Sequence, residues 1–418
     1  MSLKLRLIIM NFLQFFIWGA WLITVANYWF GTKGWSPDEF GMVFMTLGIS
    51  SLFMPTLLGI LADRWINAEK IYGVSHILGG LAVFGLSLAN NSSEFFWIML
   101  IAMLFYMPTI ALTNTIAYNA LKNSGLDVVK SFPAIRVWGT IGFIAAMWVT
   151  NLTGNKATEF QFYISAIAAF VLGIYSFTLP KCPPMSKGIK SSSFVKMMGL
   201  DAFKLFANYK MLIFFLFSMF LGAALQLTNM YGDVFLSDFE KIPQYADSFV
   251  IEYSTIVMSI SQISETLFIL AIPFFLKRFG IKKVMLLSMF AWVLRFGLFS
   301  FGNPEEFLWM IILSNIIYGM AFDFFNISGS LFVETQVEAN IRASSQGLFM
   351  MMTNGFGAII GSVVSGIIIE KYFILPSGLK DWSGIWITFA AYALVITVLF
   401  AILFKHKHNP KEVQSFSH

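Results

Sequence analysis

The chain has 418 residues, of which 58% are hydrophobic and only 12% are charged, and its mean hydropathy is +0.75. A soluble domain carries about 25% charged residues, so this composition excludes a soluble protein and indicates a membrane protein with many spans. The net charge of +5 does not indicate nucleic-acid binding, because the basic residues lie in short segments between apolar runs. The single Cys182 excludes an internal disulfide and a thiolate metal site.

Apolar segments, separated by charged or Pro-, Gly- and Asn-rich breaks, predict an all-α protein with twelve transmembrane helices. The first run is longer than a signal-peptide core and has no small-residue cleavage site, so we expect it to be retained as a span. The predicted spans are residues 6–30, 40–62, 71–90, 95–120, 134–153, 160–180, 210–236, 251–276, 283–301, 306–332, 343–370 and 383–405.

The distribution of Lys and Arg predicts the orientation of these spans. If the N-terminus is cytoplasmic, the cytoplasmic segments hold 21 basic residues and the outer loops hold 5. Because basic residues concentrate on the cytoplasmic side, this bias places both termini in the cytoplasm.

The longest break between spans carries Lys, Ser and Pro and divides the chain into two groups of six spans. Both groups place a short charged turn after their second span, in GILADRWINAEK and in FFLKRFGIKKVM. Paired six-span halves are a common layout of secondary transporters, whose site lies near the bilayer midplane. We therefore predict a six-helix half at 1–180, a cytoplasmic loop at 181–209, a six-helix half at 210–405 and a cytoplasmic tail at 406–418.

Two carboxylates lie inside apolar spans. Glu265 is near the middle of the run MSISQISETLFILAIPFFL, with Gln262 one turn earlier, and Asp323 lies in YGMAFDFFNISGSLF. A charge at that depth costs at least ~2.5 kcal/mol, so it usually faces the protein interior or a water-filled path. The two acids predict a polar cavity that exchanges protons. A structural partner for Asp323, either Arg295 or Arg136, is the alternative, and His76 stands alone in its span.

Helical spacing groups further side chains on common faces. Arg136, Thr140 and Phe143 are at i, i+4 and i+7, and Gln226 and Asn229 are at i and i+3. Tyr318 and Phe322 are at i and i+4, while Asp323 is rotated by about 100° from Phe322. Ordinary helix packing is the alternative for each residue alone, because polar side chains often bind neighbouring helices and the chain holds 47 Phe.

Several stretches carry a family resemblance. GILADRW (59–65) is similar to the loop signature of the major facilitator superfamily, G-x-L-A-D-R-x-G-R-K, and departs from it after Arg64. The whole chain resembles the bacterial nucleoside:proton symporter family of that superfamily, in LQFFIWGAWL (13–22), FPAIRVWGTIGF (132–143), LGAALQLTNM (221–230), ISQISETLFILAIPFFL (260–276), AFDFFNISGS (321–330) and MMTNGFG (351–357). The resemblance implies the major facilitator fold and a bacterial cytoplasmic (inner) membrane protein that imports nucleosides with protons by alternating access.

The resemblance also implies roles for individual residues. It implies proton coupling at Glu265 and Asp323, and a conformational latch at Gly59, Asp63 and Arg64. It implies a monomer in the lipid bilayer that is not an enzyme, with a nucleoside and a proton as partners and without cofactor, metal or nucleic acid. The substrate-binding residues that it implies are Arg136, Thr140, Phe143, Gln226, Asn229, Gln262, Glu265, Tyr318, Phe322 and Asp323.

The chemistry of these side chains suits a nucleoside. Carboxylates and amides can hold ribose hydroxyls, and the amides of Gln226 and Asn229 match base edges because each offers a donor and an acceptor. A base can stack on Phe143, Tyr318 or Phe322. No cluster of Lys and Arg is present for a phosphate, which favours nucleosides over nucleotides.

Three other functions remain open. A proton-coupled sugar or small-glycoside symporter would also use acids and aromatic rings. A membrane-embedded enzyme would need a nucleophile–base pair or a metal cluster, and no HExxH, P-loop or CxxC pattern is present. A solute-sensing receptor would need an output segment. Sodium coupling in place of proton coupling is not excluded by the residues.

Overall fold

The structure, a computed structural model, describes residues 2–184, 200–338 and 341–407. Within these ranges the protein is helical, and one isolated β-bridge pairs Ile374 with Lys380. The chain divides into two compact units, which are described separately below.

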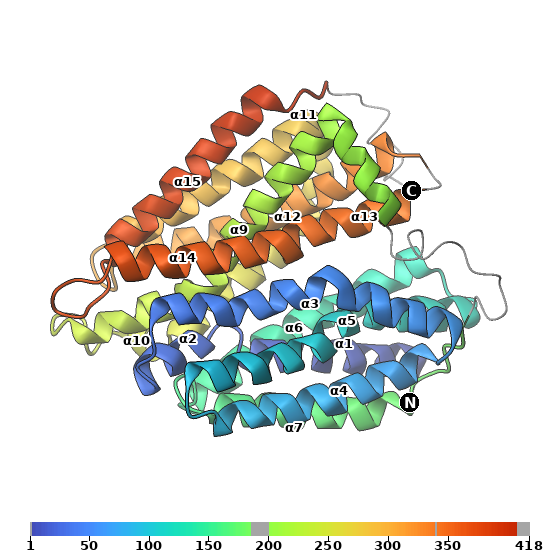
Figure 1. Cartoon of the computed structure of the whole chain (residues 1–418), viewed down its shortest axis with the longest axis horizontal. Helices are drawn as coiled ribbons and strands as arrows, with labels where there is room; N and C mark the ends of the chain where they lie inside the picture. The colour runs from blue at the N-terminus through green and yellow to red at the C-terminus, as the bar shows by residue number, and fades with distance from the viewer. Residues whose placement is uncertain (1, 185–199, 339–340, 408–418) are drawn as a thin grey trace. The chain divides into compact units, whose positions relative to one another are not determined.

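The first unit spans residues 1–198 and consists of helices of very different lengths (Figure 1). The long apolar helices form where the sequence offers runs of about 20 residues with few charges. The elements are α1 (Leu3–Gly19), α2 (Val25–Asn27), the π-helix η1 (Tyr28–Thr32), α3 (Pro37–Arg64), α4 (Ala68–Gly85), the 3₁₀ turn η2 (Leu86–Leu88), α5 (Ser92–Asn123), α6 (Val128–Leu152) and α7 (Phe160–Ser176).

The predicted span 6–30 is not one uninterrupted helix. Helix α1 ends at Gly19, turns follow over residues 20–24, and α2 and η1 complete the segment. In the turn, the Thr24 hydroxyl donates a hydrogen bond to Gln161 Oε1 at 3.0 Å. Hydropathy could not reveal this interruption, because the residues on both sides of it are equally apolar.

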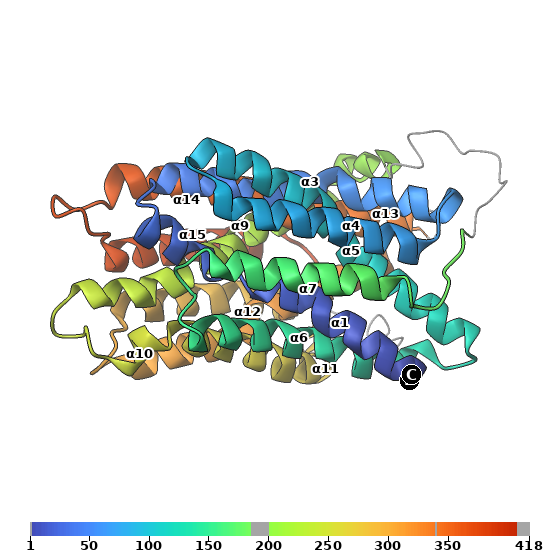
Figure 2. The same cartoon turned by 90° about the horizontal axis from the view of Figure 1, so that it is seen from below.

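Small residues bring α1 and α6 into close contact. A Cβ atom at Gly142 would collide with the backbone oxygen of Phe12, and one at Gly19 would collide with the backbone oxygen of Phe143. Glycine at such a crossing allows two backbones to approach, as in many membrane helix pairs. Helix α1 consequently lies against α6 and also against α7, which packs on α4 (Figure 2).

Hydrogen bonds accepted by Glu69 hold the segment after α7 against the start of α4. The backbone N–H of Cys182 donates to Glu69 Oε2 at 2.8 Å, and the backbone N–H of Ala68 donates to the Cys182 carbonyl at 3.0 Å. Asn67 Nδ2 binds the other oxygen of Glu69 at 2.8 Å. These bonds satisfy a buried carboxylate with neutral donors and hold Cys182 in a buried position.

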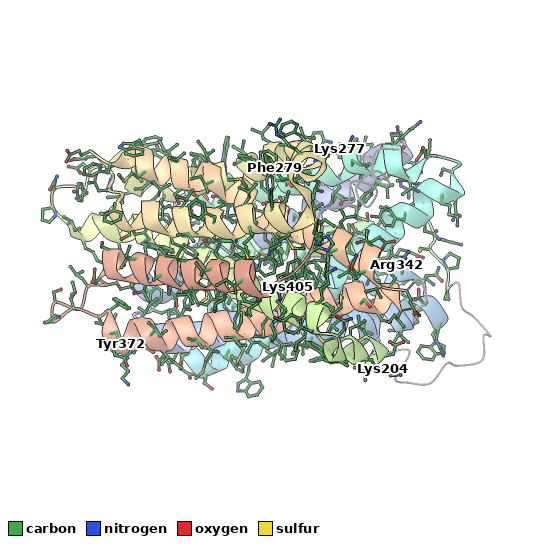
Figure 3. The ribbon with its side chains drawn as sticks, turned by 90° about the horizontal axis from the view of Figure 1, so that it is seen from above. Lys204, Lys277, Phe279, Arg342, Tyr372 and Lys405 are labelled. Atoms are coloured by element: carbon green, nitrogen blue, oxygen red, sulfur yellow. The ribbon has the colours of Figure 1, made fainter. Side chains whose placement is uncertain are left out.

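The second unit spans residues 199–418 and is also helical in its described part. Four basic side chains from its predicted cytoplasmic segments, Lys204, Lys277, Arg342 and Lys405, lie away from the end of the unit that carries Tyr372 (Figure 3). The elements are η3 (Leu200–Ala207), α9 (Tyr209–Asp238), η4 (Phe239–Lys241), α10 (Phe249–Glu252), α11 (Ser254–Phe301), α12 (Leu308–Gln336), α13 (Arg342–Met350), the π-helix η5 (Met351–Gly357), α14 (Ala358–Tyr372) and α15 (Trp382–Leu403).

Helix α11 contains the predicted span 283–301 and all but the first three residues of the predicted span 251–276, and its two parts are joined at a kink. Gly280 has φ 77° inside it, a left-handed conformation that glycine adopts without a Cβ penalty. Lys277 and Phe279 mark this bend in Figure 3. The kink folds α11 back, so that both of its parts pack against α12.

In the described part of the chain, nine helical segments are long and apolar enough to cross a membrane, and α7 is a shorter apolar helix. The 48 residues of α11 count as one of the nine although they cover nearly all of two predicted spans. The expected all-helical membrane protein is therefore confirmed, and the count of twelve spans stays a prediction.

Candidate functional site

In the first unit, the predicted face of α6 lies beside α1. Arg136, Thr140 and Phe143 are half-buried there. The Arg136 guanidinium lies over the Phe15 ring, 4.1 Å from its centroid, and the edge of the Phe143 ring meets Trp18 at 6.4 Å between centroids. The close α1–α6 crossing thus gives the cationic and aromatic members of this face aromatic neighbours, which restrict their rotamers.

The predicted latch residues occupy the last turns of α3. Asp63 is exposed, Arg64 is half-buried, and no atom lies within 4 Å of a Cβ at Gly59. Among the residues that the structure describes, Asp63 and Arg64 do not form an ion pair. Their role as a latch stays a prediction.

In the second unit, Gly319 brings α12 into contact with α11 at Glu265. A Cβ atom at Gly319 would lie 2.5 Å from the carbonyl carbon of Ser264 and 2.7 Å from the backbone N of Glu265. The Ser264 hydroxyl donates to the Ile316 carbonyl, which fixes the register of the two helices at this point. The predicted Glu265 therefore lies at a tight helix crossing and is half-buried.

Tyr318 connects the two predicted acids. It is 5% exposed, and its hydroxyl is close enough to Glu265 and Asp323 to interact with both electrostatically. Asp323 is also 5% exposed. The Tyr318 ring packs edge-on against Trp292, at 5.9 Å between centroids. The structure thus brings three sequence-predicted residues of α11 and α12 into one cluster.

The amide residues have acceptor atoms without protein donors. Gln226 on α9 is buried, and Gln262 on α11 is half-buried. In the described part of the chain, the side-chain carbonyl oxygen of each is buried without a hydrogen-bond donor. A buried acceptor without a donor costs free energy, so a ligand that donates to it gains affinity. Asn229 and Phe322 are half-buried.

Sequence reasoning considered Arg295 only as a partner for Asp323. In the structure its guanidinium lies over the Tyr318 ring, 4.7 Å from the centroid. The signal in the sequence was a basic residue inside span 283–301, but spacing along one helix could not identify a neighbour on α12.

His76, the lone histidine of its predicted span, belongs to a buried polar cluster of the first unit. Gln14 Oε1 accepts from the Tyr72 hydroxyl at 2.7 Å and lies 2.9 Å from His76 Nε2. Since a carboxamide oxygen only accepts, His76 carries its proton on Nε2. Gln14 Nε2 donates to Thr109 Oγ1 at 2.8 Å. The cluster joins α1, α4 and α5, and a small cavity adjoins it at His76.

Potential metal ligands do not cluster in the described part of the chain. In the three described ranges, no group of three or more His, Cys, Asp or Glu side chains is arranged to bind an ion. The polar residues of the second unit instead combine carboxylates, amides and rings, an arrangement that can bind a small neutral solute and a proton.

Comparison with known proteins identifies relatives over almost the whole chain. Residues 1–409 match the family model described as nucleoside H⁺ symporter. The chain is 49% identical to the nucleoside permease NupG of Escherichia coli K12 over 421 residues, covering 100% of both chains, and 48% identical to the xanthosine permease of the same organism over 416 residues, covering 99% of both. It superposes on a crystal structure of nucleoside transporter NupG with a TM-score of 0.90 at 50% identity, covering 97% of this chain and 100% of that one.

Proposed function

We propose that this chain, which belongs to the nucleoside H⁺ symporter family, imports nucleosides together with protons across the bacterial inner membrane by alternating access. The observation that carries the proposal is the cluster of Glu265, Asp323 and Tyr318, in which two acids and an aromatic ring meet inside a membrane-spanning unit. Similarity to permeases named for nucleosides and for xanthosine supports the substrate class. The chain is a transporter and not an enzyme.

The proposed binding residues contact the nucleoside in two ways, through aromatic rings and through amide groups. Phe143, Tyr318 and Phe322 offer aromatic faces to the base, at roughly 1–3 kcal/mol for each stacked base in nucleic-acid binders. The unfilled acceptors of Gln226 and Gln262 suit ribose hydroxyls or base N–H groups. Arg136, Thr140 and Asn229 complete the proposed set from α6 and α9.

Glu265 and Asp323 are proposed to carry the proton. A charged carboxylate at membrane depth is costly, so protonation lowers the free energy of the buried unit. Because Tyr318 interacts with both acids, a proton on either of them changes the electrostatic field at a proposed base-stacking ring. Proton binding and nucleoside binding then act on the same residue.

The remaining assignments complete the proposal. Both termini lie in the cytoplasm, as the distribution of Lys and Arg predicts. The chain acts as a monomer in the lipid bilayer. Gly59, Asp63 and Arg64 form the cytoplasmic latch that opens and closes during transport.

The decisive experiment measures uridine accumulation in proteoliposomes with an imposed pH gradient. Glu265→Gln keeps the shape of the side chain but cannot release a proton, so we expect gradient-driven accumulation to be lost. Glu306→Gln, which changes an exposed carboxylate outside α11 and α12, is the matched control and should transport like the original protein. Undiminished accumulation by the Glu265 variant would remove this residue from the coupling role.

The same assay separates the alternatives that the residues alone left open. Removing sodium should leave uptake unchanged, whereas collapsing the pH gradient should abolish accumulation. Unlabelled nucleosides should compete with labelled uridine, and free sugars should not. Competition by sugars at similar concentrations would contradict the proposed substrate class.

A further inference from the structure

The guanidinium of Arg295 is fully buried in the second unit, where 0% of the residue surface is exposed. An arginine inside a membrane-spanning helix is costly unless protein groups replace its water. Its Nε donates to Thr228 Oγ1 at 3.2 Å, and its Nη1 donates to the Ser314 carbonyl at 2.8 Å and lies 3.5 Å from Asn315 Oδ1. Among the described residues no carboxylate pairs with it, so neutral acceptors hold this charge.

Two aromatic rings and one unused donor complete its surroundings. The guanidinium lies 4.9 Å from the centroid of the Phe299 ring and 4.7 Å from that of the Tyr318 ring. The faces of aromatic rings attract a cation more strongly when water is excluded from the contact. In the described part of the chain, Nη2 has no acceptor although it is buried. The side chain is therefore immobilised by its neighbours while it keeps one donor available.

Three contacts of Arg295 lead to proposed binding residues. Tyr318 is itself one of them. Thr228 is adjacent to Asn229 on α9, and Asn315 also accepts from the Ser261 hydroxyl at 2.7 Å, one residue before Gln262. The guanidinium thus contacts α9 and α12 directly, and Asn315 extends this network to the first part of α11.

We propose that Arg295 is a positioning residue for the nucleoside and proton site, an inference that rests on the proposed function. Its planar fork fixes Tyr318 and the helices that carry the amides, which a flexible ammonium could not do equally well. Tyr318 interacts electrostatically with Arg295, Glu265 and Asp323, so the guanidinium and both acids act on the same ring.

Other titratable groups around the guanidinium are few. Helix α9 adds Asp233, which is 1% exposed, and Tyr231, whose hydroxyl lies 3.5 Å from Ser365 Oγ. Helix α15 carries no charged residue, and its Tyr392 hydroxyl donates to the Phe220 carbonyl at 2.7 Å. Removing the positive charge of Arg295 therefore leaves the acids with less stabilisation of their ionised forms.

The test compares three variants in proteoliposomes, by uridine KM, maximal rate and the pH dependence of uptake. Arg295→Lys keeps the charge but loses the planar fork that binds Thr228 and the Ser314 carbonyl beside Tyr318, so KM should rise by roughly tenfold while the pH profile stays in place. Arg295→Gln loses both the charge and the planar fork, so KM should rise. The pH profile of uptake should also move to higher pH, because Glu265 and Asp323 then stay protonated up to a higher pH. Phe301→Leu, which changes an exposed ring at the end of the same helix, is the control and should leave KM unchanged.

The measured KM and pH profile decide whether Arg295 positions the site. Wild-type KM and an unmoved pH profile in both arginine variants would overturn it, as would a lower maximal rate with unchanged KM, which indicates a merely structural role. If Arg295→Gln fails to fold, Arg295→Lys decides by its KM. Failure of the original protein to accumulate uridine would instead refute the proposed function, so the two failures are distinguishable.

Discussion

Replacing Gly319 with alanine tests whether the α11–α12 crossing positions the proton site. The added Cβ would lie 2.5 Å from the carbonyl carbon of Ser264, where ordinary contact begins at 3.4 Å. The shortfall is 0.9 Å, and the obstacle is helix backbone, so no side-chain rotation can remove it. The two helices must therefore separate or slide by about that distance at Glu265.

Two effects of different size follow from this displacement. Overpacking in a close-packed interior costs typically ~1–3 kcal/mol, so the midpoint of thermal unfolding should fall by several degrees. The functional effect should be larger, because a misplacement of about 1 Å at a reactive site can lower rates by roughly 10²-fold. Since Gly319 neighbours Tyr318 and contacts Glu265, we expect proton-driven uridine uptake to fall at least tenfold, as an order-of-magnitude estimate.

The assay measures uptake and thermal unfolding of the same purified preparations. Gly297→Ala is the matched control, since Gly297 also lies on α11 and has no atom within 4 Å of an added Cβ. It should retain uptake and unfold at the original temperature or slightly above it, because alanine favours the helix by about 1 kcal/mol over glycine. Normal uptake and an unchanged midpoint for Gly319→Ala would refute the reasoning, because the crossing would then accommodate a methyl group without moving Glu265.

Two further predictions concern the first unit. Burial together with the negative charge of Glu69 raises the pKa of the Cys182 thiol to about 11. Maleimide reacts with the thiolate, so labelling of Cys182 at neutral pH should be roughly a hundredfold slower than labelling of a free thiol. The labelling rate should increase with pH up to pH 11. Glu69→Gln should speed labelling, and a rate independent of pH would contradict this. Gln14→Leu leaves the tyrosine and histidine donors of the buried cluster without their acceptor, at about 1–3 kcal/mol each, and should lower the unfolding midpoint. Thr115→Val, which removes an exposed bond, should not lower it.

The sequence predicted helices well where one apolar run is one helix. The predicted span 95–120 lies inside α5, and 210–236 lies inside α9, because hydropathy and helix length report the same physical constraint. It did not reveal changes of helix type inside one apolar segment. The predicted span 343–370 matches the helical segment Ser344–Tyr372, within which the π-helix η5 separates α13 from α14.

The candidate site was predictable only within single helices. Spacing at i and i+3 grouped Gln262 with Glu265 before any neighbour was known. Spacing could not connect Arg295 with Tyr318 or Gln14 with His76, since those contacts depend on how helices cross. Crossings are set by the positions of small residues such as Gly319, and no rule of single-helix periodicity gives the partner.

The position of Tyr318 has a thermodynamic consequence for coupling. A ligand shifts a conformational equilibrium only by its difference in affinity between the states, so proton and nucleoside must act on a shared element. Tyr318 is such an element, because it interacts with Glu265 and Asp323 and also presents a ring to the proposed site. Linkage is reciprocal: if a proton on either acid strengthens nucleoside binding by some factor, bound nucleoside strengthens proton binding by the same factor. Arg295 lies over the same ring, so its proposed positioning role predicts that replacing it changes this linkage.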